Sequence, residues 1–156
     1  MRLLFPGSFD PPHCGHLDVI ERAAAVARAG GGELLIAVAD NPDKPGWLPL
    51  ERRLALVTAM CRPVPGTRIV TYRGATVTFA QTAGVDTLVR GLRNPLDFEH
   101  EKAMAEVNRS HGVDTLFFMT AGSHAHLSSH LVRSACTAGL PIDRLVPPMV
   151  LAGLAP

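Results

Sequence analysis

Two histidines flank a glycine near the N-terminus, in the segment FPGSFDPPHCGH that spans Phe5 to His16. The segment follows an apolar run and leads into an amphipathic stretch, which predicts a strand, a turn and the start of a helix. Unpaired backbone N–H groups and the helix dipole make such a helix N-terminus attractive to anions. A ring N–H of His16 can donate to a phosphoryl oxygen as negative charge develops on it. The pattern therefore favours a nucleotide site.

A glycine and a serine, Gly7 and Ser8, form the turn before these histidines. Glycine lets the backbone approach a ligand closely, and the serine adds a hydroxyl. A turn with two solvated histidines is the plain alternative, which the preceding strand and the Gly-Ser turn disfavour. A zinc site at His13 and His16 is also disfavoured, because no carboxylate or thiol stands beside them at zinc spacing.

Further donors and cations follow other apolar runs. Arg90 and Arg93 come directly after one such run, and guanidinium groups pair bidentately with phosphate oxygens. Lys44 lies in a proline-rich loop, where it is either a surface lysine or a charge that closes over a phosphate. Ser128 and Ser129 open a helix, which they either cap or help to bind a pyrophosphate. No nucleophile is paired with a general base, so the pattern favours phosphoryl or nucleotidyl transfer by positioning and charge stabilisation.

The elements that position these side chains alternate between apolar strands and amphipathic helices. We predict strands at 3–5, 33–39, 68–72, 87–89 and 115–119, and helices at 18–28, 50–61, 77–83, 95–109, 128–137 and from about 147. This alternation predicts an α/β fold, a Rossmann-like doubly wound five-stranded parallel sheet in a single domain over residues 1–156. Ligands bind beyond the carboxyl ends of the strands in such folds, which is where the motifs fall.

Composition excludes several other classes of protein. The 156 residues are 47% hydrophobic with a formal net charge of +1, which argues against disorder and against a nucleic-acid partner. No apolar run approaches the roughly 20 residues that span a bilayer, so we expect no membrane association and a cytoplasmic location. The three cysteines lack metal or disulfide spacing and are expected to be reduced thiols.

The chain also resembles a known family over nearly its whole length. The opening of the HxGH nucleotidyltransferase superfamily is similar to FPGSFDPPHCGH, and the signature of the phosphopantetheine adenylyltransferases is similar to RGLRNPLDFEHE. That family's lysine loop, serine motif and C-terminal segment resemble DKPGWLPLERR, LSSHLVR and VPPMVLAGL. The combination of RGLR with DFE is the specific part of the resemblance.

The resemblance implies an adenylyltransferase that moves AMP from ATP to 4′-phosphopantetheine, giving dephospho-CoA and pyrophosphate without a covalent enzyme intermediate. It implies catalytic roles for His16, Lys44 and Arg93. The residues that it implies for the acceptor are Ser8, Lys44, Thr76 and Arg90. Those that it implies for ATP are Ser8, Phe9, His16, Gly91, Leu92, Arg93, Glu101, His124, Ala125, His126, Leu127, Ser128, Ser129 and His130. It further implies Mg²⁺ bound with ATP, no metal ligand from the chain itself, and a homohexamer.

The chain departs from the family pattern at several places. His130 stands where a third Ser or Thr is usual, His100 replaces a common Tyr, and residues 124–126 lack an aromatic side chain. The segment RAGGGELL is longer than usual, and we expect it to lengthen a loop away from the site. Two alternatives stay open. One is another HxGH nucleotidyltransferase, acting on nicotinamide mononucleotide or glycerol 3-phosphate, and the other is a non-catalytic nucleotide-binding module.

Overall fold

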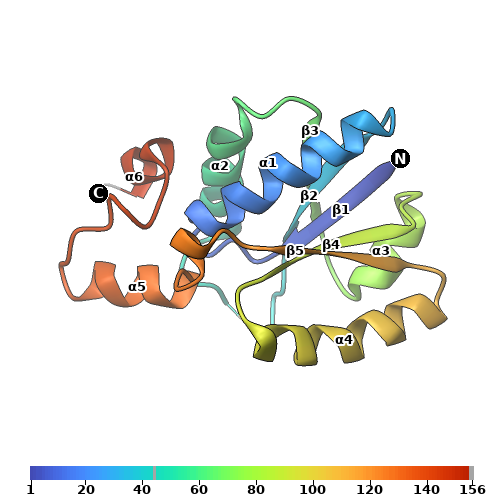
Figure 1. The fold of residues 1–156 in the computed structure, drawn as a ribbon. Coiled ribbons are helices and arrows are strands. Elements are labelled where there is room, and N and C mark those ends of the chain that lie inside the picture. The colour runs from blue at the N-terminus through green and yellow to red at the C-terminus, as the bar shows by residue number, and fades with distance from the viewer. Residues whose placement is uncertain (44, 155–156) are drawn as a thin grey trace.

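The computed structural model describes residues 1–43 and 45–154, and its centre is a five-stranded sheet (Figure 1). In spatial order the strands are β3 (Thr67–Tyr72), β2 (Glu33–Ala39), β1 (Arg2–Gly7), β4 (Thr87–Leu92) and β5 (Asp114–Met119). Every neighbouring pair is parallel. The chain moves outward from β1 to β3 and continues on the other side of β1, so a topological switch point lies between β1 and β4. The predicted doubly wound parallel sheet is confirmed.

Helices cover both faces of the sheet (Figure 1). Helices α1 (Cys14–Ala29), α2 (Leu50–Cys61) and α6 (Pro148–Leu154) contribute to one core cluster on one face. Helices α3 (Thr76–Thr82) and α4 (Pro95–Ser110) lie on the opposite side. The short 3-10 helix η1 (Gly122–His124) and helix α5 (Ser129–Thr137) follow β5. None of the described helices is long and apolar enough to cross a membrane.

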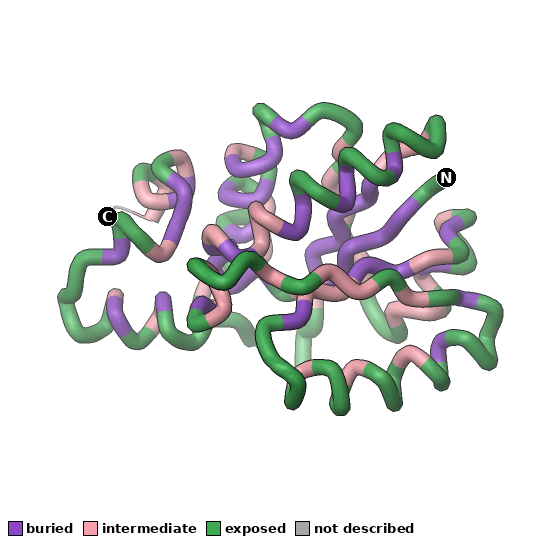
Figure 2. Tube along the Cα trace, in the orientation of Figure 1, coloured by how far each residue is buried: buried purple, intermediate pink, exposed green. Residues whose placement is uncertain are grey.

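Apolar side chains from both faces of the central strands form the core, and Figure 2 shows buried positions concentrated there. On β1, Leu3 and Phe5 pack towards α1 and α2, whereas Leu4 packs towards α3. On β2, every residue from Leu34 to Val38 is buried, as an uninterrupted apolar run predicts for a strand covered on both faces. Fully burying one such leucine side chain stabilises the fold by roughly 1.5–3 kcal/mol. The core therefore fixes the strands whose carboxyl ends carry the motifs.

The first helix begins at Cys14, and the sequence-based start at Asp18 is wrong. His13 has an extended backbone, with φ of −144° and ψ of 173°, and its ring Nδ1 accepts the N–H of Gly15 at 3.1 Å. His16 completes a capping box by accepting the N–H of His13 on its own Nδ1 at 3.2 Å. Histidine is not one of the usual N-cap residues, so capping preferences did not indicate this earlier start.

The fourth strand continues to Leu92, and the sequence-based end at Val89 is also wrong. Strand β5 runs alongside it to the end, with Arg90 opposite Phe117 in the ladder. Arg90 and Gly91 are therefore strand residues with a fixed backbone, not residues of a loop. This pairing depends on a distant segment, which local sequence patterns do not report.

The glycine-rich connection between α1 and β2 lies at the amino end of the sheet, where Arg2 pairs with Glu33. A Cβ on Gly32 would come within 1.6 Å of the Met1 carbonyl oxygen, so only glycine allows this close approach. This segment therefore lies away from the carboxyl ends of the strands, as expected.

Candidate active site

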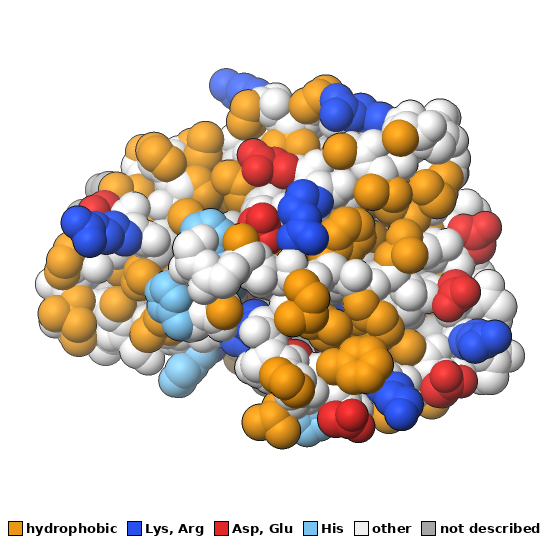
Figure 3. Space-filling view, in the orientation of Figure 1, with side chains coloured by type: hydrophobic (Ala, Val, Ile, Leu, Met, Phe, Trp, Pro, Cys, Tyr) orange, Lys and Arg blue, Asp and Glu red, His pale blue; other side chains and the backbone are white. Residues whose placement is uncertain are grey.

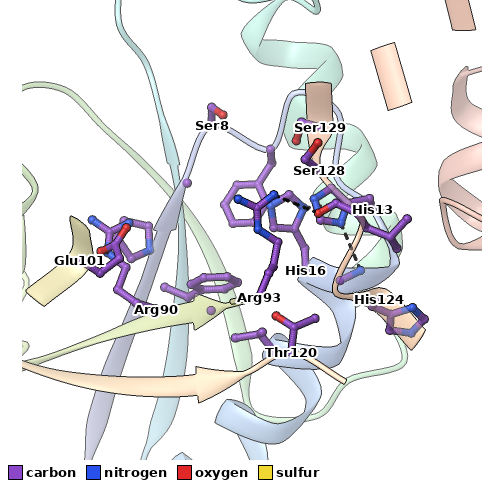
Figure 4. A pocket seen from close by; sticks show the side chains of 18 residues that line it. Ser8, His13, His16, Arg90, Arg93, Glu101, Thr120, His124, Ser128 and Ser129 are labelled. Carbon is purple, nitrogen blue, oxygen red and sulfur yellow. Dashed lines mark hydrogen bonds and ion pairs between the residues drawn. The ribbon is translucent and has the colours of Figure 1, made fainter. Parts of the chain in front are cut away.

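A cavity of about 300 Å³ opens at the carboxyl ends of β1 and β4, at the topological switch point of the sheet. Its walls come from the turn after β1, the start of α1, the end of β4, helix α4 and the segment from Thr120 to Ser129 (Figure 4). The residues in its walls include Ser8, His13, His16, Arg90, Arg93, Glu101, Thr120, His124, Ser128 and Ser129. The topology thus brings together motifs that lie more than a hundred residues apart in the sequence.

The two histidines of the first motif are stacked, with ring centroids 3.7 Å apart. Each Nδ1 accepts a backbone N–H, from Gly15 to His13 and from His13 to His16. A neutral imidazole that accepts on one nitrogen carries its proton on the other, so both rings carry a proton on Nε2. His16 lines the cavity, and its Nε2–H is the donor that a ligand oxygen would meet.

Burial keeps both rings neutral. The pKa of His13 is lowered from 6.5 to about 4, mainly by burial and to a smaller extent by electrostatic interactions with Arg93 and His124. Burial is also the main cause that lowers the pKa of His16 well below 6.5. Electrostatic interactions with His13 and Arg93 are smaller causes of the same shift. The alternative of two solvated histidines is therefore wrong. A neutral donor of fixed orientation can stabilise developing negative charge without any change of its own protonation state.

The turn after β1 has a conformation that its aromatic side chain explains. Phe9 has a φ of 49°, in the left-handed region, and its ring is buried against Phe5 and His16. A Cβ on Gly7 would come within 3.0 Å of the Phe9 ring. Internal packing therefore favours glycine at this position, and Gly7 also lines the cavity. Ser8 is exposed in this turn and lines the cavity.

A buried arginine of α2 ties this turn to two other segments. One nitrogen of Arg53, Nη1, donates to the carbonyl oxygens of Ser8 and Ala39, both at 2.8 Å. Nε of Arg53 donates to the carbonyl oxygen of Leu48 at 3.2 Å, in the loop that follows β2. The carboxylate of Asp10 accepts two backbone N–H groups of the same loop, at 2.6 and 2.8 Å. Lys44 belongs to this loop but lies outside the described residues.

Both arginines of the second motif line the cavity, and each is paired with a carboxylate. Arg90 Nε lies 3.2 Å from Glu101 Oε2, and Arg93 Nε lies 2.9 Å from Asp97 Oδ2. Arg93 Nη1 also donates to the carbonyl oxygen of Leu127 at 3.3 Å. Figure 4 shows Arg93 reaching towards the rings of the two histidines. The arginines are therefore already oriented in the cavity wall.

The serines at the start of α5 have internal partners as well as a place in the cavity wall. Ser128 Oγ caps the helix by accepting the N–H of Leu131 at 3.1 Å. Ser129 Oγ donates to the carbonyl oxygen of Pro11 at 2.9 Å, which joins α5 to the turn after β1. Helix capping, which the sequence left open for this pair, is therefore confirmed for Ser128.

Some residues that the sequence assigned to ligands lie outside the cavity walls. The hydroxyl of Thr76 lies 2.9 Å from that of Tyr72, and the side chain of Leu92 is buried in the core. Three members of the stretch from 124 to 130 are also absent from the walls: Ala125, His126 and His130. His130 is exposed at the second residue of α5. Ligand contacts of these residues stay predictions.

The cavity also contains residues that the sequence analysis did not assign to ligands. His13 stacks on His16, Val19 lies one helical turn further along α1, and Thr120 directly follows β5. Thr120 could have been identified from the sequence by its position just after a predicted strand, because the carboxyl ends of parallel strands share one edge of the sheet. Val19 could have been identified by its spacing of three residues from His16, because residues three apart on a helix lie on the same face.

Comparison with known proteins gives a consistent picture. The cytidylyltransferase-like family model matches residues 4–135. The chain is 41% identical to a phosphopantetheine adenylyltransferase of Prochlorococcus marinus, over 99% of this chain and 97% of that protein. It is 38% identical to a phosphopantetheine adenylyltransferase of Parasynechococcus marenigrum, over 99% and 93% of the two chains. Among solved structures, a protein assigned as a nicotinate-nucleotide adenylyltransferase from Vibrio parahaemolyticus has a TM-score of 0.72 at 19% identity, over 98% and 90% of the two chains, which supports the fold alone.

Proposed function

This chain belongs to the phosphopantetheine adenylyltransferases of the cytidylyltransferase-like family, and we propose that it transfers AMP from ATP to 4′-phosphopantetheine. The products are dephospho-CoA and pyrophosphate. The observation that carries the proposal is the identity of 41% across 99% of the chain. The cavity supports it, because its walls combine oriented donors and cations, as nucleotidyl transfer by positioning requires.

The arrangement of the walls supports separate places for the two substrates. In Figure 4, Arg90 and Glu101 lie at one end of the cavity and Ser128 and Ser129 at the other, with His16 between them. The acceptor phosphate binds at the Arg90 end, with Lys44 and Ser8. The β- and γ-phosphates of ATP bind near Arg93 and the start of α5. The α-phosphorus then lies close to His16.

The reaction is a direct displacement. An oxygen of the acceptor phosphate forms a new bond to the α-phosphorus of ATP, and the bond from that phosphorus to the bridging oxygen of pyrophosphate breaks. Negative charge increases on the α-phosphoryl oxygens during this step, and the Nε2–H of His16 donates to one of them. Arg93 stabilises the charge on the departing pyrophosphate. Arg90 and Lys44 orient the attacking phosphate, so the chain acts through position and charge.

Magnesium fits this site as an ion that accompanies ATP. The described residues contain no group of three side chains that could hold a metal ion, and the carboxylate in the cavity wall, Glu101, is paired with Arg90. Mg²⁺ commonly keeps several waters and binds through substrate phosphates, which suits such a wall. When bound, the ion neutralises part of the phosphate charge. The hydroxyl of Ser128, whose oxygen accepts in the helix cap and whose hydrogen can still be donated, and the guanidinium of Arg93 would then hold the phosphates themselves.

We expect the protein to form homo-oligomers, with a hexamer as the expected assembly. An apolar surface on α4 and β5 supports this expectation, and Figure 3 shows apolar side chains gathered there. Its exposed residues, here called the α4–β5 surface, are Leu96, Phe98, Met104, Val107, Leu116 and Met119. Exposed apolar patches of this kind commonly mark interfaces between proteins. A cytoplasmic location also stays a prediction.

The substrate assignment is tested by measuring pyrophosphate release. Purified protein with Mg²⁺ and ATP should release pyrophosphate when 4′-phosphopantetheine is present and not in its absence. Nicotinamide mononucleotide, tested as acceptor under the same conditions, should support little release. Equal or greater turnover with nicotinamide mononucleotide would overturn the assignment. ATP binding without turnover on any acceptor would instead support a non-catalytic nucleotide-binding module.

A further inference from the structure

A single carboxylate holds the guanidinium of Arg93. Nε of Arg93 donates to Asp97 Oδ2 at 2.9 Å, and Nη2 donates to Oδ1 at 3.0 Å. The backbone N–H of Arg93 donates to Oδ2 as well, at 3.0 Å. These hydrogen bonds raise the pKa of Arg93 and lower the pKa of Asp97. Both side chains therefore remain charged at neutral pH, in the bidentate geometry that suits this pair.

Asp97 is itself fixed by the start of α4. It is the third residue of that helix, after Pro95 in the first turn. Asn94 caps the helix, and its Oδ1 accepts the N–H of Asp97 at 2.9 Å. A carboxylate in the first turn of a helix also interacts favourably with the helix dipole. The position of the Asp97 carboxylate is thus set by the backbone of α4.

The pairing leaves part of the guanidinium available. An arginine side chain has five N–H donors, and Asp97 takes the edge formed by Nε and Nη2. Nη1 donates one further hydrogen to the Leu127 carbonyl oxygen at 3.3 Å. One hydrogen on Nη1 and one on Nη2 remain, on a residue that lines the cavity. An anion in the cavity can accept them without breaking the ion pair.

We propose that Asp97 is a positioning residue, which orients Arg93 so that its remaining donors meet the phosphates of ATP. The inference rests on the proposed role of Arg93 in ATP binding. The opposite relation is a competition, in which Asp97 holds Arg93 away from the nucleotide. The two relations predict opposite signs: loss of the carboxylate weakens ATP binding if Asp97 positions Arg93, and tightens it if Asp97 competes.

A double-mutant cycle tests the inference on the full-length protein. Calorimetric titration with ATP and Mg²⁺ is carried out on the unmodified protein, Asp97→Asn, Arg93→Ala and the double variant. Asp97→Asn should weaken ATP binding by about tenfold, within the range of coupled neighbouring residues. In the Arg93→Ala background the same substitution should have almost no further effect. Glu99→Gln is the control, because Glu99 is an exposed carboxylate on the same helix.

Two further measurements separate positioning from a general structural role. Affinity for 4′-phosphopantetheine and the melting temperature should be nearly equal in Asp97→Asn and Glu99→Gln. Unchanged or tighter ATP binding by Asp97→Asn, or an equal loss in the Arg93→Ala background, would overturn the inference. If Arg93→Ala alone binds ATP normally, the proposed role of Arg93 fails, and the inference that depends on it fails too. Pyrophosphate release by the unmodified protein then reports on the proposed reaction separately.

Discussion

At His16 the position of the proton determines which ring nitrogen can donate to a ligand. Nδ1 accepts the backbone N–H of His13, so the neutral ring can donate only from Nε2. We expect His16→Ala to lower kcat by about 10²–10³-fold, the usual effect of losing one donor to charge that develops in the transition state. ATP affinity should change little, because that charge is smaller in the ground state. Single-turnover rates and calorimetric ATP affinities measure the two effects.

The same substitution also removes the capping bond to His13, so it needs a structural control. Glutamine is a natural partner at this position of a capping box, and His16→Gln can accept the His13 N–H through its side-chain oxygen. Its melting temperature should therefore lie closer to that of the unmodified protein than that of the alanine variant. Its kcat should stay low. Near-normal kcat in His16→Ala would reduce His16 to a structural residue.

Burial of His13 makes stability depend on pH. Its pKa is about 4 in the folded protein and 6.5 in the unfolded reference, so the unfolded chain binds more protons between these values. Stability should therefore be lost as the pH falls from 6.5 towards 4, by roughly 3 kcal/mol from this residue. Above pH 6.5 this residue should cause no change. Urea unfolding at pH 7, 6 and 5 measures the slope.

The matched variant for this pH dependence is His13→Asn. Asparagine is a good N-cap and can accept the N–H of Gly15, but it does not titrate. Carboxylates also titrate between pH 4 and 5, and they do so in both proteins. The difference between the two slopes therefore isolates His13. Equal slopes would show that the His13 ring is not desolvated in the folded protein.

At the scale of elements, side chains from two helices, α2 and α5, hold the turn after β1. Arg53 of α2 donates to the carbonyl oxygen of Ser8, and Arg133 of α5 donates to that of Asp10 at 2.6 Å. Ser129, also in α5, donates to the carbonyl oxygen of Pro11. Each donor satisfies a backbone group that would otherwise lack a partner away from water. The turn is thus held by long-range hydrogen bonds as well as by the packing of its own Phe9 ring.

Arg53→Lys tests this arrangement while keeping the positive charge. A lysine ammonium on a flexible stem cannot reproduce the planar donors that reach three carbonyl oxygens. We expect a loss of roughly 2–4 kcal/mol in the free energy of unfolding, since buried carbonyls would lack partners. A lower kcat/KM should follow, because Ser8 would no longer be held. Denaturant unfolding and steady-state kinetics measure these changes.

The control for this prediction is Arg62→Lys. Arg62 is exposed at the end of the same helix, so its replacement should change stability by less than about 0.5 kcal/mol. The comparison separates the loss of specific hydrogen bonds from a general effect of exchanging arginine for lysine. If the two variants are equally stable, Arg53 does not hold the turn.

The elements themselves were largely predictable, because hydrophobic periodicity reports burial directly. The strand at 33–39 and the helix at 50–61 have the predicted bounds. Ser8, His16, Arg90 and Arg93 were identifiable by type, spacing and family resemblance, and all four line the cavity. Supporting residues such as Arg53 were not predictable, since their partners are carbonyl groups of distant segments. A sequence shows side-chain chemistry more readily than it shows which backbone group is nearby.

At the scale of the whole molecule, α4 differs from the other long helices in how little of it is buried. Among the described residues of α4, Asn108 is the buried one, whereas Leu96, Met104 and Val107 are exposed. A monomer would leave these apolar side chains in water, at a cost of roughly 25 cal/mol for each Å² of apolar surface. Two copies that pack these faces together would remove this cost. The α4–β5 surface therefore supports association of the chain with itself.

A charge placed in that surface should weaken the assembly. We expect Val107→Glu to shift the protein to a smaller species in light scattering coupled to size exclusion, because an unpaired carboxylate is costly to bury at an interface. Leu140→Glu is the matched control, since Leu140 is exposed to 59% and lies beyond α5, outside the α4–β5 surface. That variant should keep the molar mass of the unmodified protein. If the unmodified protein is monomeric, or if both variants keep the same molar mass, the α4–β5 surface is not an interface between copies of this chain.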